Sequence, residues 1–479
     1  MVSYTKVRRR IDLALLHNHT EYSNLRLKDS TNRIEQMVLY AANELKLKGL
    51  AITDHEYIGN HVKAINITKK LKAKGKIPED FKVILGNEIY LIDEQDMNYR
   101  LENKLPIRFY HFILLAKDEI GHLQLQRLSS RAWSRAFTYR RIERVPTFYD
   151  DIEEIVDSNP GHLIASTACL GGFLGAKVME GEYESARNFI GWCQDVFGEE
   201  NFYLEMQPHR KEYDESGAEV ISEQQRVNQW IHKEGYPTIV TTDAHYLREE
   251  DREIHKSYLK SDEDEETYSS GGRETDAFYS TCYLMDGEEI MDNLSYLPKN
   301  FLMECFANSV DIANRCEEYD LAQKVEIPEI PLPDEWDYDE EVLEFVQQGD
   351  WKNINYMLNS DDEYDRYLMS LAFYGIKERN LSKETRWKQT LDRLDQEMYE
   401  LIGITKAKDT TVSKYFINTH KMIDIFWNDA NCMVGPSSRG SAAGWELNYL
   451  LQISAQSPLD QPMEMPLWRF ISSERPDYP

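Results

Sequence analysis

Apolar and polar positions alternate regularly over the first half of the chain. Apolar runs of four to ten residues are separated by longer stretches with helical periodicity. The helical stretch 32–49 is predicted to end at Gly49, as a C-terminal cap. The predicted strands are 11–16, 50–53, 83–92, 112–116, 162–167, 202–206 and 238–243. Strand followed by helix, repeated over residues 1–250, predicts an α/β domain of the parallel barrel type.

The second half follows a different pattern. Residues 261–276 are acidic and rich in glycine and serine, which is typical of an exposed loop or linker. Helical periodicity follows over 288–319 and 338–430, on either side of the proline-spaced segment 327–336. We therefore expect three parts, namely 1–260, a connection over 261–335, and 336–479.

Residue types that bind metals stand at the ends of several predicted strands. Residues i and i+2 of a strand point to the same face, and the carboxyl ends of barrel strands meet at one edge. A single motif of this kind could simply be a pair of solvent-exposed histidines at a strand end. Here four apolar runs each end at a histidine or an acidic residue, and this repetition favours a metal site. These residues are His17 and His19, His55, Glu88, and Asp243 with His245.

Composition limits the class of protein. The chain is 41% hydrophobic and 11% aromatic, which allows sizeable cores, and it has no apolar run of the ~18 residues that a membrane span needs. Its six cysteines form no CxxC pair, so a reducing, cytoplasmic compartment is expected. Five of them, all except Cys169, are interpreted as ordinary buried thiols.

The formal net charge of −29 opposes nucleic-acid binding, which needs Lys and Arg at phosphates. Arg127, Arg131 and Arg135 nevertheless recur every four residues, on one helical face. This pattern fits a phosphate-binding stripe, and it fits equally a solvated face that pairs with acidic neighbours. In residues 434–451, a Gly/Ser-rich turn precedes a helical run. Its small residues, the amides of the helix and Arg439 could bind a phosphate group. Glycine-rich turns are common, so this pattern alone is weak evidence for phosphate binding.

Taken together, these stretches resemble the alpha subunit of bacterial DNA polymerase III. LHNHTEYS, AITDHE, LGNEIYL, HFILLAKDEIGHLQL, STACLGG and TTDAHYL are similar to its polymerase-and-histidinol-phosphatase (PHP) domain. VGPSSRGSAAG and LWRFISSERPDYP are similar to the start of its palm, so the resemblance covers essentially all 479 residues. It implies a distorted TIM-like PHP barrel, a helical connection and an incomplete nucleotidyltransferase-like palm, in a cytoplasmic protein of a bacterium or a phage.

The resemblance also implies a cluster of two to three divalent ions, zinc and/or manganese. Asp29 is placed in it through NLRLKDS, which is longer than the corresponding family pattern. The implied activity is metal-assisted 3′→5′ exonuclease action on DNA, centred on His17, His19, His55, Asp243 and His245. The full set of implied ligands is His17, His19, Asp29, His55, Glu88, His111, Cys169, Asp243 and His245.

In the palm, the resemblance implies that Arg439, Gly440 and Ser441 hold the triphosphate of the incoming deoxynucleotide. GPSSRGS is one residue longer than the family's GPGRGS. The family continues into Asp-x-Asp where this sequence ends at Pro479. We therefore expect magnesium-dependent polymerisation on a DNA primer–template to require those aspartates from a missing segment or from a complementary second chain. A partial palm also predicts exposed apolar surface.

Two other functions stay open. In the first, the chain is a catalytically silent assembly module whose metals are structural. In the second, it is a free-standing PHP phosphatase for a small phosphate ester, which leaves the Gly/Ser-rich turn and some 200 residues beyond the barrel unexplained.

Overall fold

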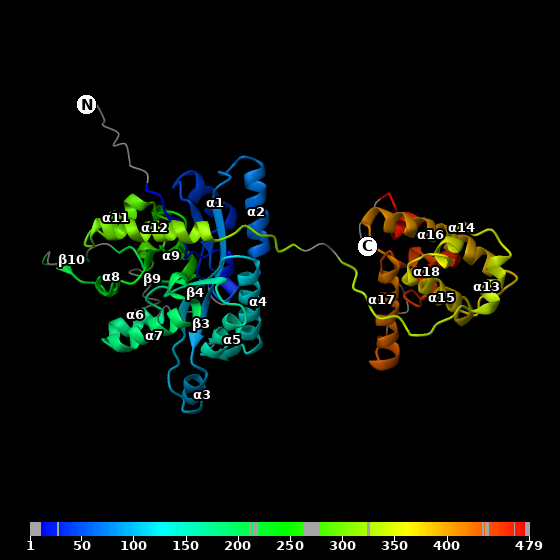
Figure 1. Cartoon of the computed structure of the whole chain (residues 1–479), viewed down its shortest axis with the longest axis horizontal. Helices are drawn as coiled ribbons and strands as arrows, with labels where there is room; N and C mark the ends of the chain where they lie inside the picture. The colour runs from blue at the N-terminus through cyan, green and yellow to red at the C-terminus, as the bar shows by residue number, and fades with distance from the viewer. Residues whose placement is uncertain are drawn as a thin grey trace. The chain divides into compact units, whose positions relative to one another are not determined.

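The computed structural model describes residues 11–25, 28–140, 142–209, 212–213, 216, 219–261, 278–322, 326–433, 435, 440–463 and 465–474. It divides the chain into two compact units, 1–323 and 324–479 (Figure 1). Helices α11 (Gly287–Asn293) and α12 (Lys299–Arg315) belong to the first unit. The division into three functional parts, with boundaries at residues 260 and 335, stays a prediction.

The first unit is built on a nearly closed barrel sheet, which confirms the predicted fold class. An isolated parallel bridge from Asn18 to Ala244 links the ends of its first and last strands. All seven predicted barrel strands are present, although the first covers only two residues. In spatial order they are β1 (Ala14–Leu15), β2 (Gly49–Ile52), β3 (Lys82–Ile92), β4 (Tyr110–Ala116), β8 (Leu163–Ser166), β9 (Phe202–Met206) and β12 (Thr238–Val240).

One strand departs from the predicted parallel arrangement. Strand β4 runs antiparallel to both β3 and β8. The physical reason is that β3 continues past the barrel edge to Ile92, and the chain returns to that same edge after α3 (Glu94–Glu102). His111 therefore lies at the edge where the other strands end, and it pairs in register with Tyr90.

Helices surround the strands of this unit (Figure 1). The predicted cap at Gly49 is wrong, because α1 ends at Asn43 and Gly49 begins β2. A Cβ atom at position 49 would lie 3.2 Å from the carbonyl oxygen of Lys82 on the neighbouring strand. The helices are α1 (Ile34–Asn43), α2 (His61–Ala73), α3, α4 (Glu119–Ser134), α5 (Tyr149–Asp157), α6 (Phe173–Glu180), α7 (Tyr183–Phe197), α8 (Glu223–Glu234), α9 (Arg252–Lys260), α11 and α12.

Shorter strands lie outside the barrel path. Strand β7 (Pro146–Phe148) extends the sheet by pairing with the far end of β3. Strand β5 (Phe137–Tyr139) pairs with β6 (Ile142–Arg144), and β10 (Glu212–Tyr213) pairs with β11 (Glu219–Val220).

The arginine face of α4 is largely neutralised by acidic neighbours. Arg131 pairs with Asp151 at 3.2 Å and with Glu154 at 2.6 Å. Arg135 pairs with Asp151 at 2.5 Å. For these two arginines the structure favours a solvated face paired with acidic residues.

The named elements of the second unit are all helical. They pack around a separate apolar core, in which Trp445, Phe416 and Phe373 are fully buried. The α-helices are α13 (Glu340–Gln347), α14 (Lys352–Leu358), α15 (Glu363–Glu378), α16 (Trp387–Lys408), α17 (Ser413–Asp424) and α18 (Glu446–Leu450). Among the residues placed by the structure, no helix is long and apolar enough to cross a bilayer.

Candidate metal centre

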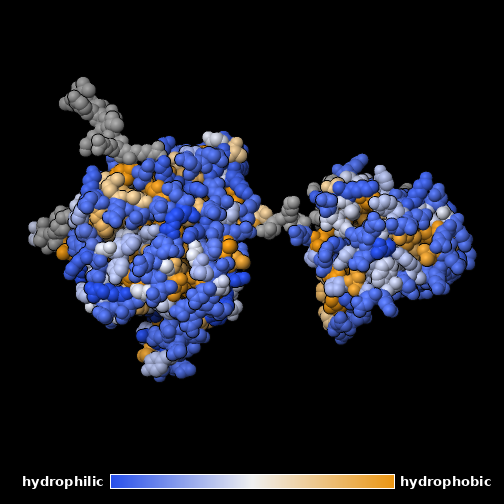
Figure 2. Space-filling view, in the orientation of Figure 1, coloured by the Kyte–Doolittle hydropathy of each residue, from blue (hydrophilic) through white to orange (hydrophobic). Residues whose placement is uncertain are grey.

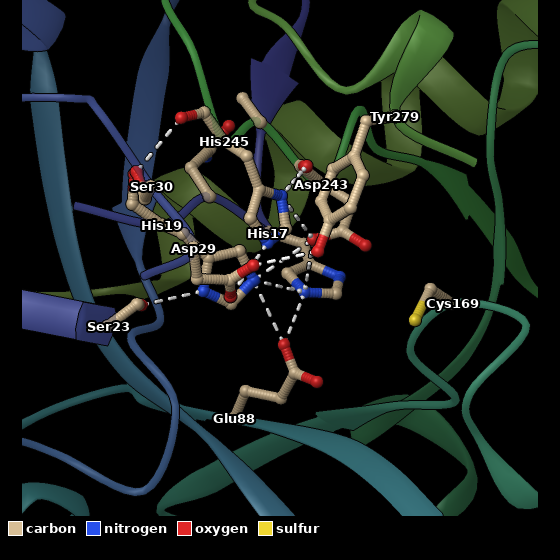
Figure 3. A network of polar contacts seen from close by, with 12 residues as sticks. His17, His19, Ser23, Asp29, Ser30, Glu88, Cys169, Asp243, His245 and Tyr279 are labelled. Carbon is tan, nitrogen blue, oxygen red and sulfur yellow. Dashed lines mark hydrogen bonds and ion pairs between the residues drawn. The ribbon is translucent and has the colours of Figure 1, made fainter. Parts of the chain in front are cut away.

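The structure brings all nine sequence-predicted ligands together at the edge where the barrel strands end. Figure 3 labels His17, His19, Asp29, Glu88, Cys169, Asp243 and His245 among them. Loops after β1, β2 and β12 supply histidines, and the extended β3 supplies Glu88. Within the described residues, metal-binding side chains form four overlapping groups. These groups are His17–His19–Glu88–Asp243, His19–His55–His245, Glu88–His111–Cys169 and Asp243–His245–Cys282.

Four donor atoms meet at the centre of the cluster. The Nε2 atoms of His17 and His19 lie 3.1 Å apart. The Glu88 Oε2 atom lies 2.8 and 3.0 Å from them, and the Asp243 Oδ1 atom lies 3.2 and 3.0 Å from them. All four residues are buried, so water does not screen this concentration of electron-rich atoms.

The hydrogen bonds of His17 fix which ring nitrogen carries its proton. Its Nδ1 atom lies 2.6 Å from Oε1 of Glu205, and a carboxylate can only accept a hydrogen bond. Ser166 and Thr241 hold the same carboxylate by donating their hydroxyls at 2.8 and 2.6 Å. Nδ1 therefore keeps its proton, and once a cation displaces any proton from Nε2, the neutral ring turns its Nε2 lone pair toward the cluster.

A second chain of hydrogen bonds orients His19 in the same way. The hydroxyl of Ser23 donates to Asp54 at 2.6 Å, so it can only accept at the Nδ1 atom of His19, 3.0 Å away (Figure 3). This tautomer leaves Nε2 of His19 as the ring nitrogen that could bind a cation in the cluster. Asp54 is fully buried and accepts further hydrogen bonds from Thr20 and Asn60.

This donor set fits a divalent cation. Two imidazole lone pairs and two carboxylate oxygens repel one another unless a positive charge lies between them. Zn–N bonds of 2.0–2.1 Å give a tetrahedron with edges of roughly 3.3 Å, and the five separations between these donor atoms are 2.8–3.2 Å. The four residues could thus hold one ion between them.

Outer ligand residues extend the centre on two sides. On one side, Oδ2 of Asp29 lies 2.6 Å from Nε2 of His55 and 3.2 Å from Nε2 of His245. On the other, the Sγ atom of Cys169 lies 3.5 Å from Nδ1 of His111. Gly171 allows this approach, since a Cβ there would lie 3.1 Å from the ring of His111.

Electrostatics shows how strongly the site attracts positive charge. Burial opposes an imidazolium, but Asp243 and Glu205 hold the pKa of His17 well above its ordinary value. Burial likewise opposes a carboxylate, but nearby imidazoles, His111 first, hold the pKa of Glu88 well below its ordinary value. Without a cation, the cluster therefore takes up protons to balance its charge.

Backbone strain occurs at three positions within or beside the ligand set. Asp243 itself has a φ of 47°, Glu56 next to His55 has 51°, and Ala168 next to Cys169 has 56°. Non-glycine residues rarely adopt this left-handed region, and such strain gathers at functional sites. The surrounding barrel therefore holds these loops in place against a local cost.

Several residues of the centre were not predicted from the sequence. Glu205 and Asp54 orient the two central histidines, and the Tyr279 hydroxyl donates to Oδ1 of Asp29 at 2.8 Å. Cys282 belongs to one of the groups that could hold a metal, whereas its sequence context predicts only an ordinary buried thiol. Cys432 is exposed rather than buried.

The Gly/Ser-rich turn of the second unit is described only in part. Arg439 lies outside the described residues, while Gly440 has a φ of 98°, a conformation suited to glycine. The amide groups of Glu446 and Leu447, at the start of α18, donate to the buried carboxylate of Glu397 at 2.7 and 2.9 Å. They are thus already paired, and phosphate binding would depend on the turn around Gly440 and Ser441.

Two family models match two separate parts of the chain. A family model described as PHP domain matches residues 16–209, and one described as bacterial DNA polymerase III alpha NTPase domain matches residues 366–479. A solved amidohydrolase from Chromobacterium violaceum is 13% identical, with a TM-score of 0.27 over 51% of this chain and 96% of that chain.

Curated relatives match almost the whole chain. "Probable DNA polymerase YorL" of Bacillus subtilis and the DNA-directed DNA polymerase of Bacillus phage SPbeta are each 37% identical, over 97% of this chain and 36% of theirs. DNA polymerase III subunit alpha of Borreliella burgdorferi is 30% identical, over 97% of this chain and 34% of its own. The chain thus spans about a third of the length of these relatives. It belongs to the DNA polymerase III alpha subunit family and corresponds to the N-terminal part of those proteins.

Proposed function

We propose that the first unit is a metal-dependent phosphodiesterase that removes nucleotides from the 3′ end of DNA. The observation that carries this proposal is the meeting of two imidazole lone pairs and two carboxylate oxygens 2.8–3.2 Å apart at the barrel edge. Family membership supports DNA as the substrate rather than a small phosphate ester. Mixed nitrogen, oxygen and sulfur donors suit zinc or manganese better than magnesium alone.

The residues divide the work between binding and orientation. His17, His19, Glu88 and Asp243 would hold the central ion, and Asp29, His55, His111, Cys169 and His245 would hold its neighbours. When bound, such ions supply an activated water near neutral pH and neutralise charge on the phosphate. Glu205 and Ser23 hold the central imidazoles in the tautomers that binding requires.

Family membership supports a role of the second unit in nucleotidyl transfer. We propose DNA primer–template and deoxynucleoside triphosphate as its partners, with Gly440 and Ser441 near the triphosphate and magnesium serving polymerisation.

One observation favours assembly as an additional function. Met422, Phe426 and Trp427, on α17 and the turn after it, are 45–52% exposed. Figure 2 shows apolar side chains at the end of this unit where Figure 1 places α17. Contiguous exposed apolar surface of this kind is typical of association sites. In a purely assembly role, the metals of the first unit would be structural.

Metal affinity is expected to rise with pH. The pKa values of His17, His55 and His245 are raised because carboxylates and other acidic groups face these buried rings. Each ion must displace protons from them, so its apparent affinity increases about tenfold per pH unit for each proton displaced. Competition with a chelator between pH 6 and 8 measures this slope. An affinity that does not change over this range would contradict the expected proton displacement.

The function is tested by incubating the purified chain with a 3′-mismatched primer–template and either manganese or zinc. We expect stepwise shortening from the 3′ end that a chelator stops and added metal restores. A folded, metal-loaded chain that leaves the primer intact would overturn the exonuclease proposal and favour the assembly function.

A further inference from the structure

Cys282 reaches the metal centre on a segment outside the nine-ligand set. The His245 amide donates to the carbonyl oxygen of Cys282 at 2.8 Å, and Tyr246 forms a parallel bridge with Tyr283. Tyr279, in the same segment, donates its hydroxyl to Asp29. Backbone and side-chain contacts thus tie residues 278–283 to two ligand loops.

The thiol of Cys282 lies among ligand atoms. Its Sγ atom, a carboxylate oxygen of Asp243 and a ring nitrogen of His245 lie within 4.8 Å of one another. The Cys282 side chain is 4% exposed, and the residue forms no disulfide. Three other buried cysteines, Cys193, Cys305 and Cys316, belong to none of the metal-binding groups found in the described part of the chain. Cys282 packs in the apolar core of the first unit as Cys193 and Cys305 do, and its place among ligand atoms distinguishes it from them.

The surroundings of Cys282 repeat those of Cys169. Glu88, His111 and Cys169 form one group of carboxylate, imidazole and buried thiol, and Asp243, His245 and Cys282 form another. The central group of His17, His19, Glu88 and Asp243 shares one carboxylate with each of them. A bridging carboxylate can join neighbouring ions, so the geometry provides a central position and two thiol-bearing outer positions.

We propose that Cys282 is a tenth ligand of the metal centre and binds an outer ion together with Asp243 and His245. The inference rests on the proposed metal-dependent function and extends it. Binding replaces the S–H bond by a metal–thiolate bond, and the proton leaves to solvent. Because thiolate favours zinc and cobalt over magnesium and manganese, this outer position selects a borderline-soft ion.

Cobalt(II) absorption tests this inference without relying on activity. The full chain is freed of metal and titrated with Co²⁺, and the thiolate-to-cobalt charge-transfer band is recorded in the near ultraviolet. We expect Cys282→Ser and Cys169→Ser each to remove about half of this band, and the double variant to remove all of it. Cys305→Ser, in the apolar core, should leave the band at the wild-type intensity.

The outcomes separate this inference from the proposed function. If Cys282→Ser keeps the full band while Cys169→Ser abolishes it, the metal centre stands and the tenth ligand is wrong. If the wild-type chain binds no cobalt, the proposed function fails as well. Circular dichroism of each variant shows whether it is folded, and Cys282→Ala provides a second substitution if the serine variant is not.

Discussion

A chain carrying His17→Ala and His19→Ala together is expected to lose metal-dependent shortening of a DNA primer. The two Nε2 atoms contact each other and both central carboxylates, so their removal leaves Glu88 and Asp243 without a neutral ligand between them. Metal-ion stabilisation of a transition state is worth several kcal/mol, so the expected loss is on the order of a thousandfold or more. The measurement is the initial rate of shortening at saturating manganese or zinc.

His162→Ala is a matched control for this variant. His162 directly precedes β8 at the opposite end of the barrel, where its Nδ1 atom lies 2.6 Å from a carboxylate oxygen of Asp118. Like His17, it is an imidazole paired with a carboxylate, but it belongs to none of the metal-binding groups of the described residues. We expect wild-type shortening from this control. A double variant of the central histidines that shortens primers as fast as the control would refute the assigned site.

Asp54→Ala is expected to produce the largest loss of stability among substitutions around the centre. Its buried carboxylate accepts four hydrogen bonds, from the Thr20 amide and hydroxyl, the Ser23 hydroxyl and the Asn60 side chain. Alanine leaves these donors buried and unpaired, at a cost of about 3–5 kcal/mol in the free energy of unfolding. It also frees Ser23, so the His19 ring loses its fixed orientation. Denaturant unfolding of the metal-free chain measures the stability change.

Asp93→Ala supplies the comparison for this substitution. Asp93 caps α3 by accepting the Asp96 amide at 2.7 Å, on an exposed part of the chain. Loss of such a cap costs about 1 kcal/mol. Equal destabilisation by Asp54→Ala and Asp93→Ala would show that the buried network does not hold the ligand loops.

The hydrophobic pattern predicts the barrel well where strands are long and apolar. Runs such as 83–92 and 202–206 coincide with β3 and β9 within a residue, because a strand buried on both faces is a continuous apolar run. Strand direction is not encoded in such a run. The antiparallel β4 follows from the excursion around α3, which local periodicity does not reveal.

The candidate ligands could be found from the sequence because they follow strand ends in recognisable motifs. Their supporting residues could not. Glu205 is a single acidic residue in an apolar strand, and it contacts His17, 188 positions earlier, only once the barrel has formed. Cys282 follows no spacing rule, and its role depends on the return of residues 278–283 to the loop after β12.

Anomalous diffraction from crystals grown with zinc or manganese tests the central claim most directly. The account predicts an anomalous peak at bonding distance from the Nε2 atoms of His17 and His19 and from the carboxylates of Glu88 and Asp243, with further peaks beside it. Crystals of the folded chain that show no peak among these atoms at saturating metal would contradict the metal centre and the catalytic function derived from it.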